Sequence, residues 1–166
     1  IPSPDYPLWT AAVTLNSGKA VHYPCPPANK FEPDLAQLRK LVSSRTRALV
    51  IINPNNPTGA VYSRATLEAM VRLAEEYGLV IFSDEIYDGM TYDGATFIPV
   101  APLVRNTLCG TFSGLSKVYR ACGFRVGWVS FSGAVDRSEH YLSALDLLAA
   151  LRLSAMTVRC MLTPLA

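Results

Sequence analysis

The feature that most constrains the fold is a short apolar run, residues 48–52 (ALVII), that stops at a cluster of turn-forming residues. An apolar side chain at every position is typical of a strand in a parallel sheet whose two faces are both covered. The residues that follow, 53–59 (NPNNPTG), cannot continue a central strand, because proline lacks a backbone N–H and asparagine and glycine favour turns. The sequence therefore predicts a buried strand over residues 47–53 that ends abruptly.

A helix and a second buried strand are predicted after this turn. Ser63 is a typical N-cap residue, and apolar side chains then recur at the spacing of one helical face until Gly78, which can end the helix. The next run, residues 79–82 (LVIF), is again fully apolar and leads into Asp84. The order of strand, turn, helix and strand indicates a parallel sheet with right-handed crossovers.

Apolar residues at strand spacing and at helical spacing continue to alternate through the rest of the chain. They predict further helices over residues 7–15, 34–42 and 136–151, and further strands over residues 20–23, 107–112 and 126–131. Helices of this length between strands place the chain in the α/β class, as a three-layer sandwich with a mostly parallel sheet.

Length, charge and cysteine spacing exclude several classes of protein. A chain of 166 residues has room for one domain, or for a large piece of one. Its formal net charge of +2 is too small to indicate a nucleic-acid partner. The apolar runs are far shorter than the roughly 20 residues that span a bilayer, so no membrane partner is predicted. The four cysteines lack the spacing of a zinc site, so we predict no metal and reduced thiols in the cytoplasm.

Side chains that can perform chemistry follow the ends of three predicted strands. They are Asn56 after the first strand, Asp84 and Tyr87 after the second, and Ser113, Ser116 and Lys117 after the third, with Arg125 further on. Ligands of parallel α/β sheets bind beyond the carboxyl ends of the strands. We therefore expect these groups to share one crevice.

Each of these residues also has an ordinary structural explanation. Asp84 could be the N-cap of a turn, and Tyr87 could be a packed aromatic residue. Lys117 could be a surface lysine, and Arg125 could pair with a surface carboxylate. The functional explanation is that an amine in a partly desolvated pocket loses its proton more easily and can form a Schiff base with a carbonyl cofactor.

Four ordered motifs together resemble the class I and II aminotransferases, which are fold-type I pyridoxal phosphate enzymes. These motifs are residues 56–59 (NPTG), 83–87 (SDEIY), 116–117 (SK) and 123–128 (GFRVGW). Within the family, the stretches 4–9, 51–62 and 114–117 look most similar to the bacterial alanine aminotransferases, which exchange amino groups between glutamate and pyruvate. The resemblance implies pyridoxal 5'-phosphate as the cofactor.

The resemblance implies a catalytic role for three of these residues. Lys117 would hold the cofactor as a Schiff base and, once displaced by the substrate, would move a proton from the substrate to the cofactor. Asp84 would keep the pyridine nitrogen protonated, so that the ring can accept electrons. Tyr87, together with Asn56, would bond the phenolic oxygen of the ring.

The resemblance also implies which residues contact the phosphate and the face of the cofactor ring. By resemblance, Arg125 and a serine hydroxyl would hold the phosphate. The family has a serine three residues before the lysine where this chain has a glycine, so the hydroxyl is assigned to Ser116, with Ser113 as second choice. Tyr6, or as second choice Trp9, would stack on the ring.

The predicted organisation is a partial large cofactor-binding domain over residues 1–153, followed by an atypical tail over residues 154–166 that we expect to be truncated or frame-shifted. Family members are more than twice this long, so the chain is expected to be a fragment that is inactive by itself. The whole protein would be a homodimer that transaminates an amino acid, alanine, with a 2-oxo acid, 2-oxoglutarate. The alternatives are an aminotransferase-like sensor domain of a transcription regulator, and an α/β binding domain whose lysine has no special role.

Overall fold

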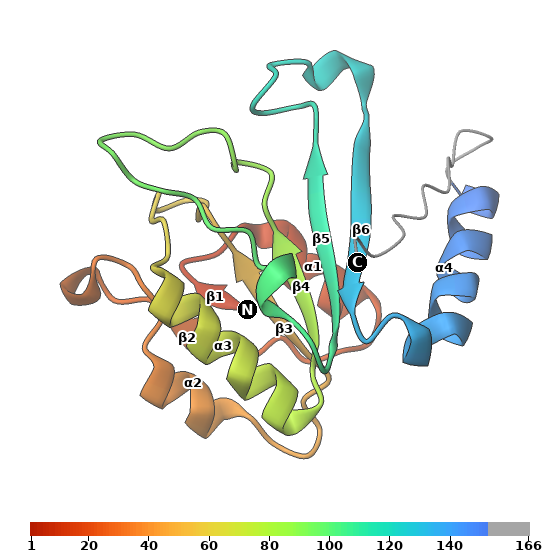
Figure 1. Cartoon of the computed structure of the whole chain (residues 1–166), viewed down its shortest axis with the longest axis horizontal. Helices are drawn as coiled ribbons and strands as arrows, with labels where there is room; N and C mark the ends of the chain where they lie inside the picture. Colours follow the sequence, from red (N-terminus) through yellow and green to blue (C-terminus); the bar gives the residue numbers. More distant parts are fainter. Residues whose placement is uncertain (153–166) are drawn as a thin grey trace. The chain divides into compact units, whose positions relative to one another are not determined.

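Figure 1 shows the computed structural model of the chain, which describes residues 1–152. The chain forms two compact units, the first over residues 1–134 and the second beginning at residue 135. The predicted tail at residues 154–166 lies outside the described residues, so the predicted domain boundaries stay a prediction.

The first unit is built on a four-stranded sheet with the order β3-β4-β5-β6. Its strands are β3 (Ala48–Ile52), β4 (Val80–Asp84), β5 (Leu108–Gly114) and β6 (Gly127–Gly133). The first three run parallel, whereas β6 pairs antiparallel with β5, from which it returns through a hairpin loop. The predicted α/β class with a mostly parallel sheet is confirmed.

The helices of this unit have the predicted positions. They are α1 (Pro7–Leu15), α2 (Leu35–Leu41) and α3 (Arg64–Tyr77), with short 3-10 helices at η1 (Pro27–Asn29), η2 (Ala101–Leu103) and η3 (Cys122–Phe124). Ser63 caps α3 by accepting a hydrogen bond from the backbone N–H of Thr66, and Gly78 ends the helix in the left-handed conformation.

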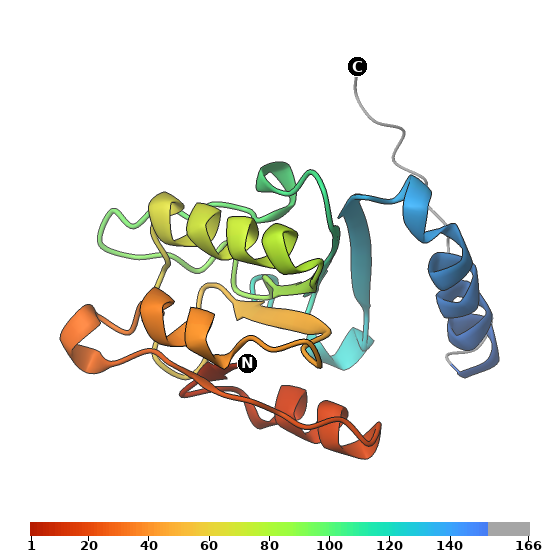
Figure 2. The same cartoon turned by 90° about the horizontal axis from the view of Figure 1, so that it is seen from below.

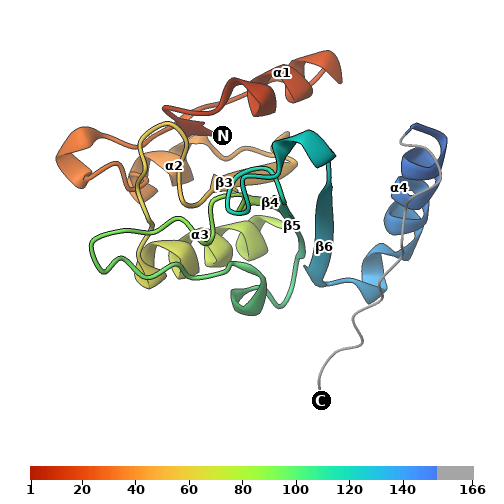
Figure 3. The same ribbon diagram turned by 90° about the horizontal axis from the view of Figure 1, so that it is seen from above.

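Alternate residues of β3 pack against opposite layers, because successive strand side chains point to opposite faces of a sheet. Leu49 and Ile51 belong to the large core cluster that includes the apolar side of α3. Val50 and Ile52 belong to a second cluster, against which Trp9 of α1 packs. Figure 3 shows α1 and α3 on opposite sides of the sheet. The continuous apolar run in the sequence thus reflects cover on both faces.

The helix α2 packs beside α3 (Figure 2), and Leu38 of α2 belongs to the same core cluster as the apolar side of α3. Arg39 of α2 donates two hydrogen bonds, of 2.7 and 2.6 Å, to the carboxylate of Glu76 on α3. This bidentate pair is exposed, so it orients the two helices more than it stabilises them.

The predicted strands have different bounds in the structure. Those predicted over residues 47–53, 79–82 and 126–131 are β3, β4 and β6, which differ from the prediction by one or two residues at their ends. The predicted strand at residues 20–23 is wrong except at its last residue, because β2 (Tyr23–Pro24) pairs only with β1 (Pro2–Ser3) and β1 is just two residues long. The predicted strand at residues 107–112 ends too early. The structure continues β5 to Gly114, because the ladder to β6 extends to the Gly114 and Gly127 pair.

The second unit contains η4 (Asp136–Ser138) and α4 (Glu139–Arg152), where a single helix over residues 136–151 was predicted. No residue of α4 is buried. Among the helices of residues 1–152, none has the length and apolar character needed to cross a membrane.

Candidate active site

The three parallel strands end side by side at one edge of the sheet. Asp84, the last residue of β4, pairs with Ile52 at the end of β3 and with Phe112 on β5. The loops that leave these strands therefore begin close together, as the sequence predicts for the carboxyl ends of parallel strands.

The loops after β4 and β5 also pack directly against each other. A Cβ atom added at Gly89 would lie 2.8 Å from Cγ1 of Val118, and one added at Gly114 would lie 3.4 Å from Cδ1 of Ile86. Val118 is the neighbour of Lys117 in the chain. The segment after β4 is therefore in contact with the turn that carries the lysine.

Side chains from all three strand ends meet at Tyr87. The amide Nδ2 of Asn56 donates a 3.3 Å hydrogen bond to the Tyr87 hydroxyl. The Nζ atom of Lys117 lies 6.0 Å from the centroid of the Tyr87 ring, at the outer limit of a cation–π contact. Asn56 and Tyr87 are half-buried and Lys117 is exposed. The structure thus brings together three of the predicted site residues.

The loop at residues 53–62 holds Asn56 in place through two buried asparagines. Asn53 accepts a 2.8 Å hydrogen bond from the backbone N–H of Tyr62 at its Oδ1 atom. The Oδ1 atom of Asn55 accepts from both the backbone N–H and the hydroxyl of Thr58, at 3.2 and 2.8 Å. Sequence reasoning predicted the turn and a role for Asn56, but not these supporting contacts.

Asp84 is half-buried and is bonded to Trp9, which is the second choice for stacking on the ring in the sequence analysis. Its Oδ2 atom accepts a 2.9 Å hydrogen bond from Nε1 of Trp9, whereas its Oδ1 atom has only a 3.4 Å contact with the backbone N–H of Ile86. The N-cap explanation for Asp84 therefore rests on a long, weak bond. Tyr6, the first choice for ring stacking, is the N-cap residue of α1 and is 45% exposed.

Glu85, which the sequence motif contains without a predicted role, fixes the end of β4. Its side chain is buried, and its Oε1 atom accepts from the hydroxyl of Ser83 at 2.8 Å and from the backbone N–H of Val100 at 2.9 Å. Burial raises the pKa of this carboxyl group, and the two hydrogen bonds oppose that rise only in part. The acidic residue next to Asp84 thus supports the strand end.

The residues predicted to hold a phosphate lie on the β5–β6 hairpin. Ser113 is part of β5 and not of the loop after it, where it was predicted. Leu115 donates a backbone hydrogen bond to Val126, so Ser116 and Arg125 each lie one residue further along the two arms of the hairpin. The backbone thus brings this serine and the arginine to the same end of the hairpin.

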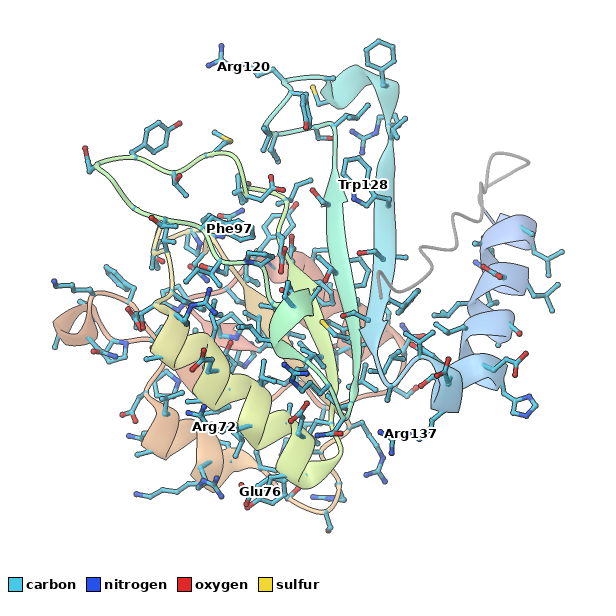
Figure 4. All side chains as sticks on the ribbon, viewed as in Figure 1. Arg72, Glu76, Phe97, Arg120, Trp128 and Arg137 are labelled. Atoms are coloured by element: carbon cyan, nitrogen blue, oxygen red, sulfur yellow. The ribbon has the colours of Figure 1, made fainter. Side chains whose placement is uncertain are left out.

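The side chain of Arg125 is bonded to its own loop. It is exposed, with φ at 52°, and its Nη1 atom donates a 2.8 Å hydrogen bond to the carbonyl oxygen of Cys122. Figure 4 shows Arg120 at the outer end of this loop, pointing away from it, and Trp128 on β6. Among the described residues, Arg125 bonds its own loop and neither of the two serines.

This set of side chains is suited to a flat aromatic ligand. Asp84 can accept from a ring N–H at Oδ1. Asn56 retains a second amide proton, and the Tyr87 hydroxyl accepts one bond and keeps its own proton for donation. Lys117 supplies an amine beside them. In residues 1–152, no group of three or more His, Cys, Asp or Glu side chains is arranged to hold a metal ion.

Comparisons with known proteins identify the class to which such a site belongs. The sequence profile of the family "Aminotransferase class I and II" matches residues 1–158. The chain therefore belongs to the class I and II aminotransferase family, whose members use pyridoxal 5'-phosphate.

The chain is similar to proteins named for alanine and glutamate chemistry. It is 52% identical to the glutamate-pyruvate aminotransferase AlaA of Escherichia coli over 155 residues, which are 93% of this chain and 38% of that protein. It is 48% identical to the alanine aminotransferase of Mycobacterium bovis over 153 residues, or 92% of this chain and 36% of that protein.

A solved structure agrees with this placement. The crystal structure of an aminotransferase from Escherichia coli matches 93% of this chain and 38% of its own, with a TM-score of 0.90 and 52% identity. The chain thus spans less than two fifths of the length of these relatives.

The donor set described above fits pyridoxal 5'-phosphate. A carboxylate suits its pyridine N–H, two donors suit its ring oxygen, and an amine suits its aldehyde carbon. Hydroxyl groups and a guanidinium group suit its phosphate. Of these, the structure brings the amide, phenol and amine together. The carboxylate lies at the end of β4, where it is bonded to Trp9, and the arginine is bonded to its own loop.

Proposed function

We propose that the whole protein is a pyridoxal phosphate-dependent aminotransferase that transfers the amino group of an amino acid, alanine, to a 2-oxo acid, 2-oxoglutarate. The observation that carries this proposal is the meeting of Asn56, Tyr87 and Lys117 at the strand ends next to Asp84. The names of the relatives favour this enzyme over the sensor domain of a transcription regulator.

Lys117 is proposed as the residue that binds the cofactor and moves the proton. When bound, pyridoxal phosphate supplies an aldehyde that takes up the substrate amine and a ring that accepts the electrons of the breaking Cα–H bond. Nζ of Lys117 would take the Cα proton as a general base and return it as a general acid. Its exposed position leaves the amine accessible to both cofactor and substrate.

Asp84, Asn56 and Tyr87 are proposed to set the charge on the ring. Oδ1 of Asp84 would accept from the pyridine N–H, which favours the protonated ring. The second amide proton of Asn56 and the hydroxyl proton of Tyr87 would be donated to the ring oxygen. The existing 3.3 Å bond between these two side chains supports this role, because it holds both donors at one place before any ligand binds.

The remaining contacts are proposed for the phosphate and the ring face. Ser116, with Ser113 as second choice, would donate its hydroxyl to the phosphate. Arg125 would join it after its side chain leaves the carbonyl oxygen of Cys122. Tyr6 would stack on the ring, since Trp9 is bonded to Asp84.

We further propose that residues 1–153 are part of the large domain of a homodimeric enzyme that works in the cytoplasm on small molecules, with neither nucleic acid nor a membrane as partner. Three cysteines of the described residues, Cys25, Cys109 and Cys122, are free thiols, which supports a reducing compartment. Burial raises the pKa of Cys109 to about 11, so this thiol is unreactive at neutral pH.

The proposal is tested by expressing the complete reading frame that contains this chain and assaying it with alanine and 2-oxoglutarate. Lys117→Ala should lower turnover by at least the roughly 10²–10⁴-fold that a general acid–base group contributes. Lys40→Ala, which removes an exposed lysine from α2, is the matched control and should leave turnover unchanged. Equal turnover in the Lys117→Ala variant and the parent protein would contradict the proposal.

A further inference from the structure

A long-range hydrogen bond ties the first helix to the site carboxylate. Nε1 of Trp9 on α1 donates to Oδ2 of Asp84 at 2.9 Å, across 75 positions of sequence. The indole N–H can only donate and the ionised carboxylate can only accept, so the direction of this bond is fixed. Hydrogen bonds to an ionised acceptor are about twice as strong as neutral ones.

The Trp9 ring is held by aromatic packing as well as by this bond. It stacks on Phe82 with ring centroids 5.9 Å apart and an angle of 24°, and it meets Phe112 edge-on at 5.4 Å and 82°. Phe82 and Phe112 also contact each other at 6.0 Å. These two residues lie on β4 and β5, the strands whose ends carry the site. The position of the indole nitrogen is therefore set by the sheet itself.

The two carboxylate oxygens of Asp84 differ in their hydrogen bonds. Oδ2 is occupied by Trp9, whereas Oδ1 has only the 3.4 Å contact with the backbone N–H of Ile86. A carboxylate that is anchored at one oxygen cannot rotate freely about χ2. Its second oxygen then keeps one direction and has capacity for a further donor.

We propose that Trp9 is a positioning residue for Asp84: its N–H holds Oδ2 so that Oδ1 faces the pyridine N–H of the cofactor. This inference rests on the proposed function, because it assigns the ligand of Oδ1. It gives Trp9 a role different from stacking on the ring. Trp9 acts through Asp84 and does not touch the reacting atoms.

The test measures cofactor affinity and not turnover. Position 9 is replaced by 3-benzothienylalanine, which keeps the two-ring shape of tryptophan and has sulfur in place of the N–H, and separately by phenylalanine (Trp9→Phe). We expect the dissociation constant of pyridoxal phosphate, followed by its visible absorbance, to rise about tenfold in the isosteric variant, as expected when a hydrogen bond to a charged group is lost. Trp128→Phe, on β6, should leave it unchanged.

A double-mutant cycle separates positioning from general stability. If Trp9 acts through Asp84, the isosteric replacement should have almost no further effect on affinity in an Asp84→Ala protein, which has no side-chain oxygen to accept from the indole N–H. An unchanged dissociation constant in the isosteric variant, or the same tenfold loss in the Asp84→Ala background, would overturn the inference. Failure of the parent and Trp128→Phe proteins to bind the cofactor would instead contradict the proposed function.

Discussion

Two strands of the same sheet, β3 and β6, differ in how they are held. In β3, four of five residues are buried, and they contribute to clusters on both faces of the sheet. In β6, no residue is buried, and Trp128 and Val129 are 48% and 42% exposed. Burial of apolar surface supplies most of the free energy of folding, so the β3 side of the sheet should be much more stable than the β6 side.

The difference between β3 and β6 explains why the side chains proposed for the cofactor ring are held by partners, whereas the arginine proposed for the phosphate is bonded to its own loop. Asn56, Asp84 and Tyr87 lie at or just after the ends of β3 and β4, and their side chains are joined to partners. Arg125 lies on the exposed hairpin and bonds its own loop. The residues proposed for the ring are thus positioned by the packed core, whereas those proposed for the phosphate depend on a hairpin with little cover.

The largest expected effect comes from removing core volume under β3. Ile51→Ala should lower the free energy of unfolding by about 2–5 kcal/mol, because Ile51 is fully buried and the change leaves a cavity. Val129→Ala on β6 should cost about 1 kcal/mol or less, since this side chain is already 42% exposed. Urea denaturation followed by circular dichroism measures both. Equal losses in the two variants would remove the distinction between the strands.

A smaller effect is expected at Glu85, where β4 ends. Glu85→Ala leaves the backbone N–H of Val100 and the hydroxyl of Ser83 without an acceptor, which should cost about 1–3 kcal/mol. Glu85→Gln keeps an acceptor oxygen and serves as the matched variant.

The stability difference between Glu85→Gln and the parent should depend on pH, because the pKa of Glu85 is raised in the folded protein. The folded state favours the protonated carboxyl, so this stabilisation is complete below the ordinary glutamate pKa of about 4.3 and is lost as pH rises through the folded value. Glutamine does not titrate. The stability of Glu85→Gln relative to the parent should therefore increase with pH, and a difference that is constant from pH 4 to pH 8 would contradict the burial of this charge.

The smallest expected effect on stability is the difference between alanine substitutions at two glycines of the hairpin region. A Cβ at Gly114 would lie 2.9 Å from the carbonyl oxygen of Val126, whereas one at Gly123 would meet nothing within 4 Å. Gly114→Ala should therefore cost about 1–2 kcal/mol of stability through overpacking. Gly123→Ala should stay within about 0.5 kcal/mol of the parent, as surface changes usually do. Thermal denaturation of the two variants tests the expected order, and a reversed order would show that the hairpin packs differently.

Much of the fold could be predicted from the sequence because its signals are local. The apolar runs of β3 and β4, the helical period of α3 and its caps at Ser63 and Gly78 each depend on residues close together in the chain. The two-residue pairing of β1 with β2 could not be predicted, because each residue pairs with one 21 positions away (Pro2 with Tyr23, Ser3 with Pro24) and the pairing has no period of its own.

The site shows the same division between local and long-range information. Asn56, Tyr87 and Lys117 could be placed at one edge, since each follows a strand whose end is readable from the sequence. The bond from Trp9 to Asp84 could not, because nothing in the composition of residues 7–15 indicates which acceptor the indole N–H would reach. The present orientation of Arg125 depends on loop geometry, which periodicity does not report.

The central claim, that Lys117 is the residue to which the cofactor binds, can be tested by chemical attachment. The protein is incubated with pyridoxal 5'-phosphate, reduced with borohydride, digested and mapped by mass spectrometry. The account predicts that the reduced cofactor is found on the peptide that contains Lys117, and not on those with Lys19, Lys30 or Lys40. Attachment to another lysine, or equal attachment to all four, would contradict it.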